Sequence, residues 1–252
     1  MIGSNEKEIA ALMDGGRKLA RILADIVKIV RPGIATIELD RLAEESIRGV
    51  GGVPSFKGYK SRGASRPYPA SLCVSVNDEI VHAIPGARVL AEGDIVGLDI
   101  GMQYKGFFTD MAITVGVGSV DKKNKKLIDA TRRALEIGIA EAKPDAHIGD
   151  IGAAIQAYAE GEGFGVVREL VGHGVGRAVH EDPEVPNWGR RGTGPEIVEG
   201  MVLALEPMIT IGSPCVKVSP DGWTWSTESG KNSAHFEHTI LITRVGAEIL
   251  TV

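Results

Sequence analysis

Two aspartates stand in adjacent apolar segments that a short turn joins. Asp99 and Asp110 lie in residues 98–114, LDIGMQYKGFFTDMAIT. A turn centred between Tyr104 and Lys105 would place the two aspartates directly opposite each other on an antiparallel pair, with Cβ atoms about 4.5–5.5 Å apart. Carboxylates this close in apolar strands repel each other and lose hydration. The pattern predicts a shared proton or a bound cation, and the alternative is a bulge that turns one aspartate to solvent.

A histidine lies in a glycine-rich segment further along the chain. His173 is flanked by Gly172 and Gly174 in residues 171–183, VGHGVGRAVHEDP. Because glycine has no side chain, the imidazole and the backbone can approach a ligand closely. We therefore expect His173 to contact a ligand or a substrate rather than to be a satisfied core histidine.

Two glutamates belong to apolar segments near the end of the chain. Glu206 ends the segment MVLALE directly before a proline, and Glu237 lies within AHFEHTILIT. A period of two places Thr239 and Leu241 on the same face as Glu237. Buried glutamates are rare unless they are paired. Each could be a charge at a strand edge, but together with the aspartates and His173 they favour one common site.

These groups make four carboxylates and one imidazole, and two divalent cations would balance the four negative charges. Oxygen-rich sites with a single histidine suit Mn²⁺, Fe²⁺, Co²⁺ or Zn²⁺ with five or six ligands. A lone tetrahedral Zn²⁺ would not need so many oxygens. The simplest interpretation is a dinuclear centre with ions roughly 3.5–4 Å apart, bridged by carboxylates and a hydroxide.

Two pairs of helices are expected to cover the strands. Apolar residues recur every three to four positions, and Asn5 and Thr36 are expected to cap the first two helices. Aligning Pro32 with Pro144 superposes helix, proline, helix and a glycine-rich end. This predicts an internal duplication of two halves, about 5–118 and 119–252, although chance is an alternative. The four predicted helices are 5–30, 36–48, 122–141 and 148–160.

Strand-like segments follow each helix pair. Helices followed by strands, repeated once, predict an α+β fold rather than alternating βαβ units. No linker rich in proline, glycine or serine divides the chain, so we expect a single catalytic domain over residues 1–252. The predicted strands are 70–77, 95–100 and 107–115 in the first half, and 166–170, 201–206, 208–211, 236–243 and 248–251 in the second.

Composition excludes several classes of function. The net charge of −5 gives no attraction to nucleic acid or to an anionic membrane. The two cysteines form no CxxC pair, which favours a reducing, cytoplasmic location. No apolar stretch approaches the roughly 18 residues of a membrane span, and the first residues do not resemble a signal peptide.

The order of these motifs resembles the type I methionine aminopeptidases of bacteria, over essentially the whole chain. The resemblance implies the pita-bread fold, in which an antiparallel sheet of two pseudo-two-fold related halves is covered by helices. It also implies removal of the initiator methionine from nascent proteins when the next residue is small. The matching segments are SLCVSVNDEIVHAIPG (71–86), GDIVGLDIGMQYKGFFTDMAIT (93–114), GHGVGRAVHEDPEV (172–185), LALEPMIT (203–210), DGWT (221–224) and HFEHTILIT (235–243).

The resemblance implies a role for each candidate metal ligand. Asp99 would bind one ion, Asp110 and Glu237 would bridge both, and His173 and Glu206 would hold the other. A hydroxide activated by the two ions would attack the scissile carbonyl, with Glu206 as general base and acid.

The resemblance also implies residues that contact the substrate. His82 would contact the peptide near the scissile bond, and His180 would hydrogen-bond the scissile carbonyl region. Tyr68, Cys73 and Trp223 would line a pocket for the methionine side chain.

Two departures from the family pattern concern this pocket. Val179 stands where an aromatic residue is frequent, and segment 58–67 is unusual and contains two arginines. Asn77 and Ser233 match positions near a monovalent-cation site.

Other functions within the same fold are weighed against these residues. An X-Pro aminopeptidase or prolidase usually has an additional N-terminal domain, whereas only 98 residues precede Asp99. A non-catalytic binding module would have lost metal ligands. Type II relatives carry a long insertion between His180 and Glu206, where this chain has only 25 residues. A monomer that contacts the ribosome transiently is expected.

Overall fold

The computed structural model describes residues 5–60 and 66–252. Four helices are present in these residues: α1 (Glu6–Ile29), α2 (Thr36–Gly49), α3 (Lys122–Glu141) and α4 (Ile148–Gly161). The strands are β1 (Val53–Pro54), β2 (Leu72–Val76), β3 (Glu79–Val81), β4 (Ile95–Tyr104), β5 (Phe107–Gly116), β6 (Gly165–Val166), β7 (Gly172–Gly174), β8 (Glu181–Val185), β9 (Val202–Leu205), β10 (Met208–Thr210), β11 (Val216–Val218), β12 (Trp225–Thr227), β13 (Ser233–His235), β14 (Glu237–Thr243) and β15 (Gly246–Ile249).

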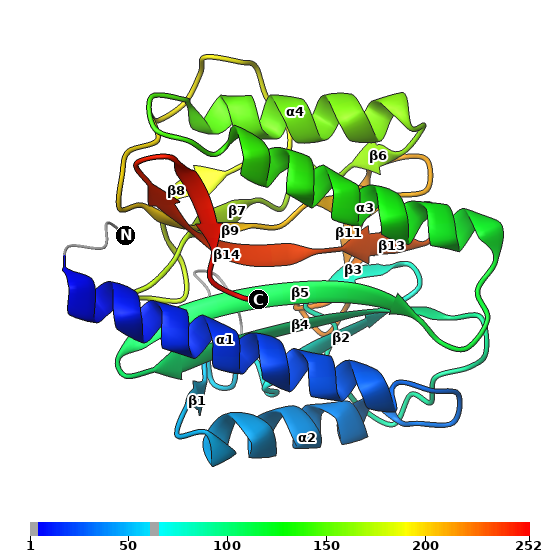
Figure 1. Ribbon diagram of the computed structural model, residues 1–252. Helices are drawn as coiled ribbons and strands as arrows, with labels where there is room; N and C mark the ends of the chain where they lie inside the picture. The colour runs from blue at the N-terminus through cyan, green and yellow to red at the C-terminus, as the bar shows by residue number, and fades with distance from the viewer. Residues whose placement is uncertain (1–4, 61–65) are drawn as a thin grey trace.

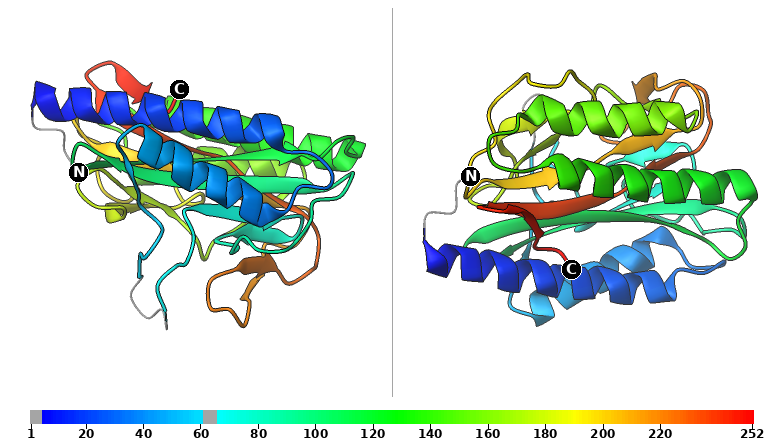
Figure 2. Two further views of the ribbon diagram at one scale, coloured as in Figure 1. Left: turned by 90° about the horizontal axis from the view of Figure 1, so that it is seen from below. Right: turned by 45° about the horizontal axis from the view of Figure 1, so that its top comes forward.

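One large antiparallel sheet organises the molecule. Nine strands pair in the order β1-β4-β5-β14-β9-β7-β8, with β2 on β4 and β15 on β14. Two small sheets, β13-β10-β6 and β11-β12-β3, lie beside it. All four helices cover one face of the large sheet, and loops extend from the opposite face (Figures 1 and 2). The predicted α+β fold is therefore confirmed.

Each helix pair buries its apolar side against one half of the sheet. Helix α1 packs on β4 and β5 and helix α2 on β2, whereas helix α3 packs on β9, β13 and β14 and helix α4 packs on α3, β6 and β8. Burying this apolar surface is the main favourable term for folding. The first core contains Leu19, Leu23, Ile26, Leu39, Ile47, Leu98 and Ile100, and the second contains Leu127, Leu135, Ile151, Ile155, Leu203, Leu205, Ile240 and Ile242.

The helix ends agree closely with the predicted ranges, but one predicted cap is wrong. Asn5 caps α1, because its side-chain oxygen accepts a hydrogen bond from the backbone N–H of Glu8 at 3.0 Å. Thr36 is instead the first residue of α2, and its hydroxyl bonds the backbone of Gly86. At this helix start the backbone N–H of Ala35 donates to the Glu38 carboxylate at 2.9 Å.

The register of the β4–β5 hairpin differs from the prediction by two residues. Asp99 lies opposite Ala112, and Asp110 lies opposite Gly101. The reason is the turn, which is centred on Lys105 and Gly106 with φ values of 50° and 87°. A two-residue hairpin turn with positive φ at both positions favours glycine at the second, so Gly106 sets the register. A shift of two residues still leaves both aspartates on the same face.

The strand predictions were better for long strands than for short ones. Strand β4 continues to Tyr104, beyond the predicted end at residue 100, whereas β6 ends at Val166 although the prediction extended to residue 170. Seven strands of two to five residues, β1, β3, β7, β8, β11, β12 and β13, were not predicted.

Among the helices of the described residues, none has both the length and the apolar composition needed to cross a bilayer.

The two halves of the chain share one further structural feature. The residue before the second helix of each pair forms an isolated antiparallel bridge, Ala35 with Val89 and His147 with Glu196. This agrees with an internal duplication, which itself stays a prediction.

Helix α1 contacts the chain end so closely that replacing one glycine should lower stability. A Cβ atom on Gly16 would overlap the carbonyl oxygen of Leu250. We expect Gly16→Ala to lower the free energy of unfolding by about 1–2 kcal/mol, because overpacking outweighs the gain in helix propensity. Urea unfolding measures this difference. Gly49→Ala is the matched control, since nothing lies within 4 Å of its Cβ. Equal unfolding midpoints for Gly16→Ala and wild type would contradict the contact.

Candidate active site

The five predicted metal-binding side chains come from five neighbouring strands. The strand order is β4, β5, β14, β9 and β7 across the middle of the large sheet. In the same order these strands carry one donor each, with Glu206 directly after the end of β9: Asp99, Asp110, Glu237, Glu206 and His173. The sheet therefore brings together residues from both halves of the chain.

The register places the first three carboxylates on one face. Asp99 and Glu237 both lie opposite Ala112, one on each side of β5. Asp110 is two residues before Ala112 on that strand. Residues that are opposite each other, or two apart on one strand, share a face of the sheet. These carboxylates therefore point to the same side.

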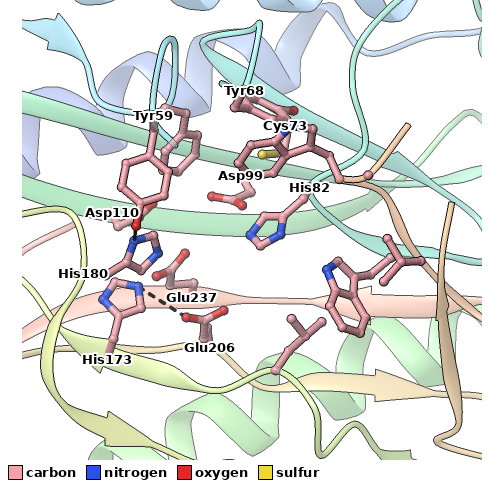
Figure 3. Close-up of a pocket in the computed structure, with 16 residues that line it drawn as sticks. Tyr59, Tyr68, Cys73, His82, Asp99, Asp110, His173, His180, Glu206 and Glu237 are labelled. Carbon is pink, nitrogen blue, oxygen red and sulfur yellow. Dashed lines mark hydrogen bonds and ion pairs between the residues drawn. The ribbon is translucent and has the colours of Figure 1, made fainter. Parts of the chain in front are cut away.

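The other two donors follow by the same argument. Ala204 on β9 lies opposite both Thr239 and His173. Thr239 is two residues after Glu237, and Glu206 is two residues after Ala204. All five side chains therefore face away from the helices, because the alternate residues of these strands belong to the helix-covered cores. Figure 3 shows them converging on one space.

The glycines on either side of His173 are needed for the packing of neighbouring strands. A Cβ on Gly172 would overlap the carbonyl oxygen of Ala204, and a Cβ on Gly174 would overlap that of Asp182. The glycines therefore allow the neighbouring strands to approach β7 closely. The ring itself is oriented by its Nδ1, which lies 2.9 Å from the carbonyl oxygen of Gly174. A carbonyl only accepts, so Nδ1 donates and Nε2 carries the lone pair.

Distances within the cluster are those of groups that can share a ligand. One donor atom each of Asp110, His173 and Glu237 lie within 4.8 Å of one another. The Nε2 atom of His173 lies 3.5 Å from Oε1 of Glu206. A threonine joins the two central strands at this point: Thr239 accepts from the backbone N–H of Asp110 at 2.9 Å and donates to its carbonyl at 2.7 Å.

Burial makes these charges costly without a counter-ion. Asp99, Asp110 and Glu237 are only 6%, 5% and 2% exposed. Burial raises the pKa of all four carboxyl groups, and neighbouring carboxylates raise the pKa further for Asp110, Glu206 and Glu237. Burial also lowers the pKa of His173 to about 3, so its imidazole is neutral.

The donor set fits divalent cations. In the described part of the chain, the buried Oδ1 atoms of Asp99 and Asp110 have no hydrogen-bond partner. Buried carboxylate oxygens normally have one, unless they bind an ion. Together with the neutral His173, they offer oxygens and one nitrogen, which are the ligands of Mn²⁺, Fe²⁺, Co²⁺ or Zn²⁺.

A cavity of about 460 Å³ lies above this cluster. The three residues predicted for a methionine pocket line it: Tyr68, Cys73 and Trp223. The rings of Tyr68 and Trp223 meet edge to face at 5.3 Å, and the Tyr68 hydroxyl donates to the carbonyl of Ala83 at 2.9 Å. Val179, which departs from the family pattern, packs in the same apolar cluster. The cavity therefore has an acidic floor and an aromatic and sulfur wall.

Both predicted substrate-contacting histidines also line the cavity. Burial lowers the pKa of His82 to about 4, and its ring lies 6.4 Å from that of Trp223. The ring of His180 contacts that of His173 at 4.3 Å, edge to face. Burial lowers the pKa of His180 as well, so both histidines are neutral side chains that can donate or accept a hydrogen bond beside the acidic floor.

Sequence reasoning missed several residues of the site, and three of them lie close to the predicted ones. Phe56 and Tyr59 line the cavity, and the Tyr59 hydroxyl lies 2.8 Å from Nδ1 of His180. His235 is buried, with Nε2 3.7 Å from Oε2 of Glu206. The period of two could have indicated His235, because it precedes Glu237 by two residues. No comparable pattern marks Phe56 or Tyr59.

Two other predictions, the unusual segment 58–67 and the monovalent-cation site, are tested only in part. Residues 61–65 of the unusual segment 58–67 lie outside the described residues. Asn77 and Ser233 are adjacent, because the backbone N–H of Ser233 donates to the carbonyl of Asn77 at 2.9 Å. The monovalent cation expected near them stays a prediction.

Known proteins are similar to this chain in sequence and in structure over its whole length. Methionine aminopeptidase 1 of Bacillus subtilis is 47% identical over 251 residues, covering 100% of this chain and 99% of that protein. The crystal structure of methionine aminopeptidase from Thermotoga maritima matches with a TM-score of 0.95 and 43% identity, over 100% of this chain and 99% of that one.

A more distant structure shares the fold alone. The prolidase from Pyrococcus horikoshii has a TM-score of 0.76 at 22% identity, and the match covers 100% of this chain but 63% of that longer one. The sequence pattern of metallopeptidase family M24 matches residues 10–244, nearly the whole chain. The chain thus belongs to metallopeptidase family M24, as a member of its bacterial, type I methionine aminopeptidase group.

Proposed function

We propose that the protein removes N-terminal methionine from peptides and nascent proteins whose second residue is small. The observation that carries this proposal is the convergence of four carboxyl groups and one imidazole on the floor of a cavity with an aromatic and sulfur wall. The floor suits hydrolysis of a peptide bond, and the wall suits a thioether side chain. The names of the similar proteins support the same activity.

The floor residues would hold two divalent cations. Asp99 would bind one ion, His173 and Glu206 the other, and Asp110 and Glu237 both. When bound, such ions polarise a carbonyl group and lower the pKa of water towards about 7. Ligand type admits Co²⁺, Mn²⁺, Fe²⁺ or Zn²⁺, and availability decides between them.

Side chains around the floor would move protons and hold the substrate. Glu206 would accept a proton from the attacking water and deliver it to the leaving nitrogen. His180 would hydrogen-bond the scissile carbonyl oxygen, where negative charge develops during the reaction. His82, on the opposite side of the cavity in Figure 3, would donate to the departing amide.

The cavity wall would select methionine. Cys73 lies directly opposite Asp99 across β2 and β4, and burial raises the pKa of its thiol, so the sulfur stays protonated. A thiol and two aromatic rings, Tyr68 and Trp223, form a polarizable surface that suits a thioether.

Its setting in the cell is part of the same proposal. Substrates of this kind are chains leaving the ribosome, so we propose transient contact with the ribosome in the cytoplasm. Both cysteines are free, Cys73 buried and Cys215 exposed, which agrees with a reducing compartment. We also propose that the protein acts as a monomer.

Peptide cleavage tests the proposed activity directly. Purified protein with added Mn²⁺ or Co²⁺ should release methionine from Met-Ala-Ser, and removing metal with a chelator should abolish the release. Alanine should not be released from Ala-Pro peptides under the same conditions, because the cavity wall favours a thioether side chain. Amino-acid analysis of the products measures both reactions. Cleavage of Ala-Pro peptides without release of methionine would favour a proline-directed peptidase.

Replacing Glu206 should separate proton transfer from substrate binding. Glu206→Gln keeps the size of the side chain but cannot accept the proton, so we expect kcat to fall by about 10²–10⁴-fold. KM for Met-Ala-Ser should change much less. One bound ion should remain, because Asp99, Asp110 and Glu237 are intact. Turnover near that of wild type would overturn the assignment of Glu206 as the base.

Replacing a shared carboxylate should impair metal loading. Asp110→Asn removes one negative charge at the centre of the cluster, so we expect fewer ions per chain and weaker binding of Mn²⁺ in isothermal titration calorimetry. Asp129→Asn is the control, because this aspartate lies on the exposed side of α3. Equal metal content in the Asp110→Asn and Asp129→Asn proteins would argue against a shared ligand.

A further inference from the structure

We propose that Tyr59 is a positioning residue that fixes the tautomer of His180, so that Nε2 of His180 presents an N–H group to the substrate. This inference rests on the proposed aminopeptidase activity for what the N–H group does. The tautomer itself can be measured without any turnover.

The contact between the two side chains joins distant parts of the chain. Tyr59 follows β1, and His180 directly precedes β8, 121 residues later. The phenolic oxygen lies 2.8 Å from Nδ1, and the ring centroids are 5.0 Å apart at an angle of 51°. Figure 3 shows the hydroxyl pointing at the imidazole from the cavity wall. Nδ1 is therefore engaged, and Nε2 is the nitrogen left for a substrate.

Elementary chemistry decides the direction of this hydrogen bond. A phenol has a pKa near 10, and it is a far better donor than the N–H of a neutral imidazole. The imidazole lone pair is likewise a better acceptor than a phenolic oxygen. Tyr59 therefore donates to Nδ1, and the ring proton of neutral His180 must lie on Nε2. The opposite arrangement would pair the weaker donor with the weaker acceptor.

The neighbouring histidine shows why this matters. His173 and His180 lie in ring contact at 4.3 Å, but their Nδ1 atoms have opposite partners. A carbonyl oxygen accepts from Nδ1 of His173, which leaves a lone pair on Nε2 for a cation. A hydroxyl donates to Nδ1 of His180, which leaves an N–H on Nε2 for a carbonyl oxygen. The partner of Nδ1 thus makes one histidine a ligand and the other a donor.

The backbone holds Tyr59 firmly enough for this role. Its N–H donates to the carbonyl of Phe56, and its carbonyl accepts from the N–H of Tyr68, both at 2.8 Å. Gly58 also donates to the carbonyl of Tyr68 at 2.8 Å, with a positive φ of 86° that favours glycine. The side chain packs against the apolar cluster that contains Phe56 and Tyr68. These contacts tie the aromatic ring to the cavity wall.

Nitrogen NMR of the full chain tests the tautomer. Protein labelled with ¹⁵N-histidine and loaded with diamagnetic Zn²⁺ is measured at pH 8, and the His180 signals are assigned by their loss in His180→Ala. In wild type, Nε2 should appear as the protonated nitrogen and Nδ1 as the lone-pair nitrogen. Tyr59→Phe should move both His180 signals toward a mixture of tautomers.

A matched variant controls for simple loss of a wall hydroxyl. Tyr68→Phe removes a hydroxyl from the same wall, but that group bonds the carbonyl of Ala83 rather than a histidine. It should leave the His180 nitrogen signals unchanged. A protonated Nδ1 in wild type, or unchanged His180 signals in Tyr59→Phe, would overturn the proposal.

Kinetics with Met-Ala-Ser test the consequence. Tyr59→Phe should lower kcat roughly tenfold, less than the loss of a complete oxyanion donor, while KM changes by less than about twofold. In a His180→Ala background, Tyr59→Phe should cost nothing further, because Tyr59 acts only through His180. Additive losses would show an independent wall role and refute the inference.

The two readouts separate this inference from the proposed activity. If wild type releases no methionine, the activity is refuted, while the NMR result still decides the tautomer. If wild type is active but Tyr59→Phe retains full kcat, the positioning role alone is refuted.

Discussion

Buried negative charge is the constraint on which the rest of the structure depends. Four carboxyl groups and one neutral imidazole share the face of the sheet that the helices leave open, and burial disfavours their ionised forms. A protein can keep such groups charged only by pairing them with cations, because leaving charges buried and unpaired is far more costly. The helix-packed faces supply the stability that lets the opposite face carry this arrangement.

The alternation of side chains between the two faces of a sheet explains how much of the site could be predicted from the sequence. The predicted register placed Asp99 opposite Asp110, and the turn at Lys105–Gly106 shifts the pairing by two residues. The conclusion survives, since a shift of two keeps every side chain on its face, whereas a shift of one would have separated them. The long strands and the helices could also be predicted, because their apolar residues recur with a clear local period and prolines mark where the helices end.

The residues that sequence reasoning missed act across long separations. His235 reaches Glu206 from the short strand β13, and Tyr59 reaches His180 across 121 residues. His235 precedes Glu237 by two residues, so a period of two would have indicated it, whereas no local pattern indicates the contact between the loop of Tyr59 and the residue before β8. Likewise, the need for Gly172 and Gly174 comes from β8 and β9, which the local sequence does not place.

Substrate selection must depend on more than the shared fold. The prolidase from Pyrococcus horikoshii has the same fold at 22% identity, so the fold alone cannot select a substrate. In this chain the five floor residues sit on or at the ends of strands of the large sheet, as does Cys73 of the wall, whereas Phe56, Tyr59, Tyr68 and Trp223 come from segments between strands. Such segments can change without disturbing strand register or helix packing. A fold built this way can keep its acidic floor while the wall above it changes from one substrate to another.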